Sequence, residues 1–209
     1  MTRKTDSLDA LIAEARAGLD DKYRAREAAL AHGRALTRTC ANAIRAMHRG
    51  ERETAREAVA GAREEAARVT QALAPHPDLR FAGYVQDAHK ELAEAAVLWA
   101  LIEQADLPTP DALGIEPAAF LNGLAEAASE GRRWALDRLR GGDTERAQAM
   151  LATMDDILSA LTTLDYPDAL TGGLRRTCDA LRAVVERTRG DVTIAVLQDR
   201  LLRALPESG

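Results

Sequence analysis

Four glutamates in the middle of the chain have the spacing that points most directly to chemistry. Glu91 and Glu94 are three residues apart, and Glu126 and Glu130 are four apart. In a helix, residues at these separations share one face. Like charges at this spacing repel by roughly 0.2–0.5 kcal/mol per pair, and burial raises the cost further unless something neutralises them. A divalent cation held between the two pairs would neutralise them.

Each acidic pair interrupts a helical stripe that is otherwise apolar or small. The first stripe continues from Glu91 and Glu94 to Leu98 and Leu101, and the second places Glu126 and Glu130 between Gly123 and Trp134. This pattern predicts that the carboxylates face the interior of a bundle or a cleft. An alternative stays open: the acids lie at the edge of the bundle, where they are solvated or pair with Lys90, Arg132 or Arg133.

Carboxylate ligands favour hard cations such as Mg²⁺ and Mn²⁺. Such ions polarise a phosphodiester and activate water, so the expected chemistry is phosphodiester hydrolysis. A ferritin-like di-iron site would need Glu-x-x-His pairs. No histidine of this chain has a glutamate three residues before it, which argues against that site.

The composition predicts an all-α fold that positions these acids. Alanine, the best helix former, is abundant, whereas aromatic residues make up only 3% of the chain. Glycine and proline divide residues 1–209 into seven expected helices in a single domain, packed as a bundle of long antiparallel helices. The expected ranges are 7–48, 51–74, 79–105, 117–139, 143–164, 168 or 174 to 187, and 191–205, with a break at Gly190.

Charge and cysteine content limit the partners and the compartment. The net charge is −5, so nucleic-acid binding would need a local basic patch rather than overall charge. Cys40 and Cys178 have no CxxC spacing and are expected to be buried, free thiols. The polar start of the chain, 1–6, and the longest apolar run, only eight residues at 95–102, predict a cytoplasmic protein with no membrane association.

The last expected helix has an apolar arc wider than a small bundle needs at its end. The arc includes Val192, Ile194, Val196, Leu197, Leu201, Leu202 and Leu205. Core packing and an intersubunit contact are both open explanations, and the second would make the protein a homo-oligomer.

Several short motifs, in order along nearly the whole chain, resemble the translin superfamily. They include Arg26-Glu27, Gly33-Arg34 and His48-Arg49-Gly50 near the start, then Leu113-Gly114-Ile115 and Phe120-Leu121-x-Gly123, and finally Tyr166-Pro167-Asp168 and Arg189-Gly190-Asp191. The resemblance implies a seven-helix fold that assembles into shell-like multimers, often octamers.

Within that superfamily the acids resemble those of the Trax branch, whose members cleave RNA with Mg²⁺. Glu91-x-x-Glu94 falls on the first Trax pair, and Glu126-x-x-x-Glu130 falls on the second, where Trax has Asp in place of Glu126. The resemblance therefore implies that Glu91, Glu94, Glu126 and Glu130 are metal ligands and catalytic residues, with Mg²⁺ or Mn²⁺ as the cofactor. The expected function is an endoribonuclease acting on single-stranded or small structured RNA.

A second function stays open, because translin itself binds single-stranded RNA and DNA without being the main nuclease. The candidate phosphate contacts are Arg80, His89, Lys90, Arg132 and Arg133.

Overall fold

The computed structural model describes residues 4–204, and all regular structure in this range is helical. The predicted all-α fold is confirmed. Six long α-helices carry the fold, joined by two one-turn helices and one short 3₁₀ segment. Their bounds are α1 Lys4–Arg49, α2 Arg52–Leu73, η1 Pro77–Phe81, α3 Gly83–Glu103, α4 Pro110–Leu113, α5 Pro117–Arg140, α6 Thr144–Thr162, α7 Asp168–Thr171 and α8 Leu174–Ala204.

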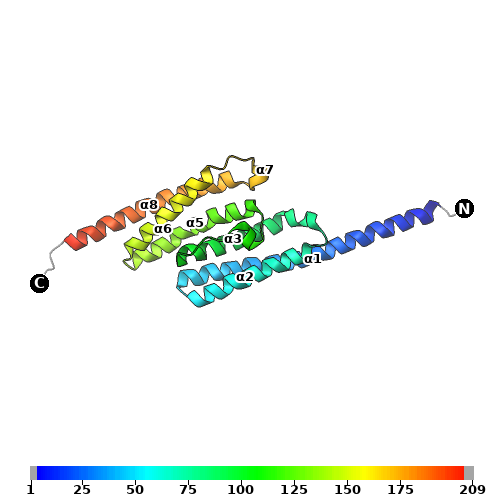
Figure 1. Cartoon of the computed structure of the whole chain (residues 1–209), viewed down its shortest axis with the longest axis horizontal. Helices are drawn as coiled ribbons and strands as arrows, with labels where there is room; N and C mark the ends of the chain where they lie inside the picture. Colours follow the sequence, from blue (N-terminus) through cyan, green and yellow to red (C-terminus); the bar gives the residue numbers. More distant parts are fainter. Residues whose placement is uncertain (1–3, 205–209) are drawn as a thin grey trace.

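The long helices form two halves that meet where α3 packs on α5 (Figure 1). The first half packs α1, α2 and α3 around buried side chains such as Leu36, Leu92 and Leu98. The second packs α5, α6 and α8 around Met154, Leu181 and Val185. Much of both cores is alanine, whose small side chain lets helix backbones approach closely. The two halves therefore share one interface, and it carries the four glutamates.

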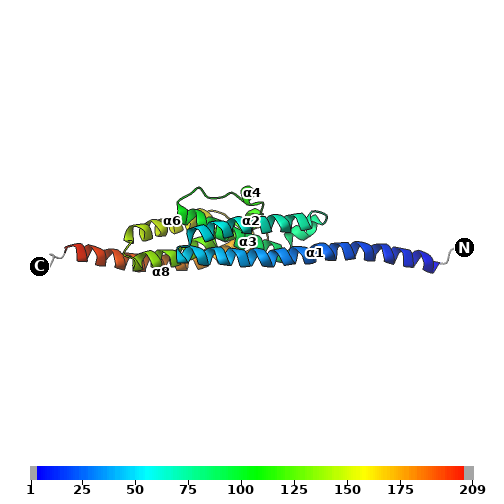
Figure 2. The same ribbon diagram turned by 90° about the horizontal axis from the view of Figure 1, so that it is seen from below.

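The two helices of this interface run parallel, although most sequential neighbours in the bundle are antiparallel. Gly123 of α5 lies against Ala93 of α3, and Trp134 and Trp99, both further along their helices, line one pocket. The connection that makes this possible is the segment 104–116, which carries α4 across one face of the bundle (Figure 2). The expected antiparallel arrangement therefore holds for the other successive long helices but not for α3 and α5.

The outermost helices extend beyond the bundle at opposite ends of the molecule (Figures 1 and 2). The expected break at Gly190 is absent, because α8 continues through this residue without a positive backbone angle. Ile194, Leu197 and Leu201 on its final turns are exposed. The Leu205 position of the predicted apolar arc lies outside the described residues.

Single residues at the helix ends explain the predicted turns between helices. Gly50 ends α1 with a left-handed φ of 73°, which costs glycine little. The Asp143 side chain accepts a hydrogen bond from the Arg146 backbone N–H at the start of α6. Cys40 and Cys178 are buried free thiols, as expected. Within residues 4–204, no helix is both long and apolar enough to cross a bilayer.

Candidate functional site

A glycine sets the distance between the two helices that carry the acids. A Cβ atom on Gly123 would lie 2.5 Å from the Ala93 Cβ and 2.5 Å from the Lys90 carbonyl oxygen. No side chain larger than hydrogen fits there without movement of the α3 backbone. The close approach holds the acidic pairs of α3 and α5 at the same level of the bundle.

Three of the four predicted acids meet at this level. Carboxylate oxygens of Glu91, Glu94 and Glu126 all lie within 4.8 Å of one another, and all three side chains are half-buried. Glu91 and Glu94 come from successive turns of α3, and Glu126 reaches them from α5. The alternative of ion pairs at the edge of the bundle also describes part of this arrangement, because Lys90 pairs with Glu126.

The close carboxylates of the cluster make ionisation of Glu94 less favourable. Burial, together with the charges of Glu91 and Glu126, raises the pKa of Glu94 from 4.5 to about 7. Near neutral pH both the protonated and the ionised forms of this carboxyl are therefore populated. A group with a raised pKa beside like charges is typical of sites that bind a cation or do proton chemistry.

Lys90 places a positive charge beside the acids of the cluster. Its ammonium donates hydrogen bonds to both carboxylate oxygens of Glu126, at 2.7 and 2.5 Å, and lies 3.6 Å from a Glu91 oxygen. Burial pulls the pKa of Lys90 down, but the hydrogen bond to Glu126 and the nearby carboxylates outweigh it, so the net shift is upward. Lys90 is therefore a charged partner of the acids, as the ion-pair alternative anticipated.

The fourth acid, Glu130, is turned toward α1. One of its carboxylate oxygens lies 2.6 Å from Nε2 of His48, whose side chain is only 2% exposed. This hydrogen bond lowers the pKa of Glu130. The other ring nitrogen of His48 has no hydrogen-bond partner among the described residues and lies 3.9 Å from Asp137. The sequence pattern did not single out His48 as a partner of the acids, since 82 residues separate it from Glu130.

The buried thiol of Cys40 lies near the cluster. Burial, followed by the charges of Glu91 and Glu94, raises the pKa of the Cys40 thiol to about 12. Among the described residues, the ligand atoms that converge within 4.8 Å are the three carboxylates.

The structure separates the predicted phosphate-binding residues. Lys90 contacts the acids, and Arg133 is exposed and 3.9 Å from Glu130. Arg132 turns away toward α8, where it donates a hydrogen bond to Thr188 and forms an ion pair with Asp191. Arg80, on η1, lies 3.2 Å from Glu116.

His89 does not lie on the surface as a phosphate contact would require. Its side chain is 1% exposed, and burial lowers its pKa to about 4. Both ring nitrogens lack a hydrogen-bond partner within the described part of the chain. His89 is thus a neutral core residue in this conformation.

Comparison with known structures identifies the fold. AfC3PO, solved in complex with duplex RNA, superimposes with a TM-score of 0.82 at 32% identity, covering 90% of this chain and 97% of that chain. AfC3PO solved separately gives a TM-score of 0.78 at 33% identity over the same shares. The chain belongs to the translin superfamily.

Two further similarities are weaker. The fold of this translin-superfamily chain is also shared by apo-NeC3PO, with a TM-score of 0.75 at 19% identity, covering 90% of this chain and 96% of that chain. A protein of Methanocaldococcus jannaschii of undescribed function is 27% identical over 186 residues, covering 88% of this chain and 82% of the relative. No family model matches the sequence.

Proposed function

We propose that this translin-superfamily protein is a Trax-like endoribonuclease that uses Mg²⁺ or Mn²⁺ to hydrolyse phosphodiester bonds in single-stranded or small structured RNA. The observation that carries the proposal is the convergence of Glu91, Glu94 and Glu126 within 4.8 Å. These are the acids that the Trax resemblance marks, and three mutually repelling carboxylates are held together here by backbone packing at Gly123.

The donor set fits a hard divalent cation. Carboxylate oxygens from two helices could each supply one ligand, and water and a phosphate oxygen would complete the shell. When bound, such an ion supplies Lewis-acid activation of the phosphodiester and of the attacking water. The raised pKa of Glu94 means that part of the site must lose a proton before the cation binds.

The residues around the cluster have separate roles in this proposal. Glu91, Glu94 and Glu126 would hold the cation, and Glu126 would have to exchange its ion pair with Lys90 for the bound cation. Lys90 is then free to contact a phosphate. Glu130 completes the set only if its side chain leaves His48, so it is the weakest of the four ligands.

Substrate binding would rely on local basic groups, because the net charge is −5. The likeness to AfC3PO, which has been solved with duplex RNA, supports a nucleic acid as the ligand. Arg133, beside Glu130, and Arg80, paired with Glu116, remain candidate phosphate contacts, whereas His89 is buried and Arg132 is engaged by α8. We further propose that the protein acts in the cytoplasm as a homo-oligomer, an octamer by the family resemblance.

A translin-like, non-catalytic protein that binds single-stranded RNA or DNA is the second candidate. The Lys90–Glu126 ion pair favours it, because it shows that an internal cation already offsets part of the acidic charge. In that case nucleic-acid binding would depend on salt and would need no divalent ion.

Cleavage of a labelled single-stranded RNA with Mg²⁺ or Mn²⁺ tests the proposal. The native protein should cut, Glu126→Ala should not, and Glu126→Asp should retain activity because Asp keeps the ligand type. Glu57→Ala, on an exposed face of α2, is the matched control and should cut normally. If the native protein binds RNA in the presence of chelator and never cuts it, the non-catalytic alternative replaces the nuclease.

A further inference from the structure

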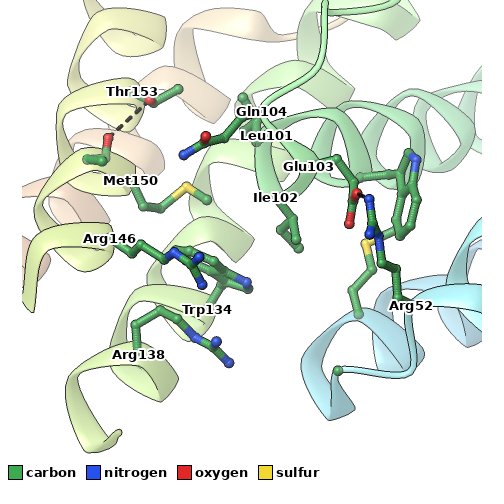
Figure 3. Close-up of a pocket in the computed structure, with 14 residues that line it drawn as sticks. Arg52, Leu101, Ile102, Glu103, Gln104, Trp134, Arg138, Arg146, Met150 and Thr153 are labelled. Carbon is green, nitrogen blue, oxygen red and sulfur yellow. Dashed lines mark hydrogen bonds and ion pairs between the residues drawn. The ribbon is translucent and has the colours of Figure 1, made fainter. Parts of the chain in front are cut away.

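A cavity lies further along α3 and α5 than the acidic cluster, about one helical turn beyond Glu130. A cavity of about 440 Å³ opens where the last turns of α3 and α5 meet α6 and the α1–α2 corner (Figure 3). The chain has two tryptophans, Trp99 and Trp134, and both line this cavity. The proposed nuclease chemistry uses neither of them.

The cavity lining is cationic. Arg52, Arg138 and Arg146 face one acid, Glu103, which is bound by Arg52. Arg146 is exposed and lies 3.6 Å from Asp143 at its own helix start. The Arg52–Glu103 pair is neutral overall and Arg146 is paired with Asp143 outside the lining, so the charge of Arg138 is the one that these contacts leave uncompensated.

Arg138 is the least satisfied of these groups. Its guanidinium carbon lies 5.2 Å from the centre of the Trp134 ring, in a cation–π arrangement. Within residues 4–204 it forms no ion pair, and its buried Nε atom has no hydrogen-bond partner. Figure 3 shows Arg138 and Arg146 gathered with Trp134 at one end of the cavity, across from Arg52 and Glu103. A half-buried guanidinium without an acceptor is costly unless a ligand supplies one.

We propose that this cavity binds a nucleotide, with its base against the tryptophans and its phosphate on Arg138 and Arg146. Aromatic rings stack on bases of any sequence, and guanidinium groups form paired hydrogen bonds with phosphate oxygens. The volume is of the size that encloses a small organic ligand. An anionic aromatic compound matches the lining better than a purely apolar or a purely inorganic one does.

The position of the cavity indicates where the nucleotide belongs. Trp134 follows Glu126 of the cluster by eight residues, about 12 Å along the helix axis, and Met47 in the lining is next to His48, the partner of Glu130. An RNA strand on the acidic cluster would therefore place a neighbouring or terminal nucleotide in the cavity. This last step rests on the proposed function, whereas nucleotide binding itself does not.

Tryptophan fluorescence of the intact protein tests the proposal, because both tryptophans line the cavity. Uridine 5′-monophosphate, added with chelator present, should quench the emission saturably, after correction with N-acetyltryptophanamide for absorbed light. Arg138→Gln and the more exposed Arg146→Gln should each weaken binding at least tenfold. The matched control, Arg140→Gln, lies on the same helix but does not line the cavity and should bind normally.

Three results would overturn the proposal: no quenching at millimolar nucleotide, equal weakening by Arg140→Gln, or equally tight binding of uridine without its phosphate. Unfolding curves of both cavity variants show whether a loss of binding reflects misfolding. Because Arg146 is exposed, Arg146→Gln should fold normally and keeps the test valid even if Arg138→Gln is unstable. Glu126→Ala separates the two claims, since it should abolish RNA cleavage and leave nucleotide binding unchanged. If the native protein binds the nucleotide but cleaves no RNA, the proposed nuclease function is wrong and the proposed nucleotide-binding cavity stands.

Discussion

Lys90 of α3 and Glu126 of α5 form the hydrogen-bonded ion pair that closes the acidic cluster. The ammonium donates to both carboxylate oxygens, at 2.7 and 2.5 Å. A divalent cation that binds Glu91, Glu94 and Glu126 must therefore compete with a charge already in place. This contact makes Lys90 a regulator of cation affinity in the proposed site.

Replacing Lys90 with glutamine should tighten Mn²⁺ binding. The substitution removes a positive charge next to the incoming cation, and an interaction on the order of 1 kcal/mol corresponds to roughly fivefold tighter binding. Titration calorimetry of the native protein and Lys90→Gln measures the change. Lys22→Gln removes the same charge near Asp78 on η1 and should not alter affinity. Unchanged or weaker binding in Lys90→Gln would show that the lysine does not compete with the cation.

Glu94→Gln should stabilise the metal-free protein at pH 8 by about 1–3 kcal/mol, because it removes a carboxylate that burial and its neighbours disfavour. The pKa of Glu94 is raised from 4.5 to about 7, so the folded state binds the proton more tightly than the unfolded state does. The destabilisation of the folded state by ionised Glu94 is absent below pH 4.5, grows as the pH rises toward 7, and stays constant above about pH 7.

Urea denaturation at several pH values measures this difference. The gain of Glu94→Gln over the native protein should shrink toward zero near pH 4, and the exposed variant Glu57→Gln should show no such trend. A loss of stability at pH 8 would contradict the assignment of Glu94 as a strained carboxylate.

Gly123→Ala should destabilise the protein and weaken cation binding. Alanine gains about 1 kcal/mol of helix propensity over glycine, but its Cβ would lie 2.5 Å from the Lys90 carbonyl oxygen. Moving α3 away costs more, so we expect a net loss of about 1–3 kcal/mol. Gly190→Ala in α8, where a Cβ meets no atom within 4 Å, should instead gain about 0.5–1 kcal/mol. Thermal unfolding compares the two, and equal stabilisation by both would contradict the close approach of α3 and α5.

Leu197→Gln combined with Leu201→Gln should reduce the size of the proposed homo-oligomer. Both side chains are exposed near the C-terminal end of α8, with exposed fractions of 53% and 67%. Burying such leucines between copies contributes about 1.5–3 kcal/mol each. Sedimentation velocity measures the size, and Arg203→Gln on another face of α8 is the control. An unchanged assembly would assign the interface to another surface.

The central part of the site could be predicted because it depends on helix periodicity. Spacing of three residues places Glu91 and Glu94 on one face, and the same rule applies to Glu126 and Glu130. The glycine near the second pair, Gly123, was part of the predicted stripe, but its role as a spacer required the packed structure.

The remaining features depend on contacts between distant residues. The His48–Glu130 hydrogen bond and the pairing of Arg132 with Asp191 join different helices, and no local pattern encodes them. The burial of His89 could not be predicted from the sequence, because histidine is common both in cores and on surfaces and the neighbouring acids favoured a surface position. The missed continuity of α8 has a similar cause, because packing of this helix against α5 and α6 outweighs the cost of about 1 kcal/mol for an internal glycine at Gly190.

The most direct test of the central claim is the position of Mn²⁺ in crystals grown with this ion, read from its anomalous scattering. We predict a peak about 2 Å from carboxylate oxygens of Glu91, Glu94 and Glu126, with the Lys90 ammonium withdrawn from Glu126. Absence of a peak at saturating Mn²⁺, with Lys90 still bound to Glu126, would contradict the proposed metal centre.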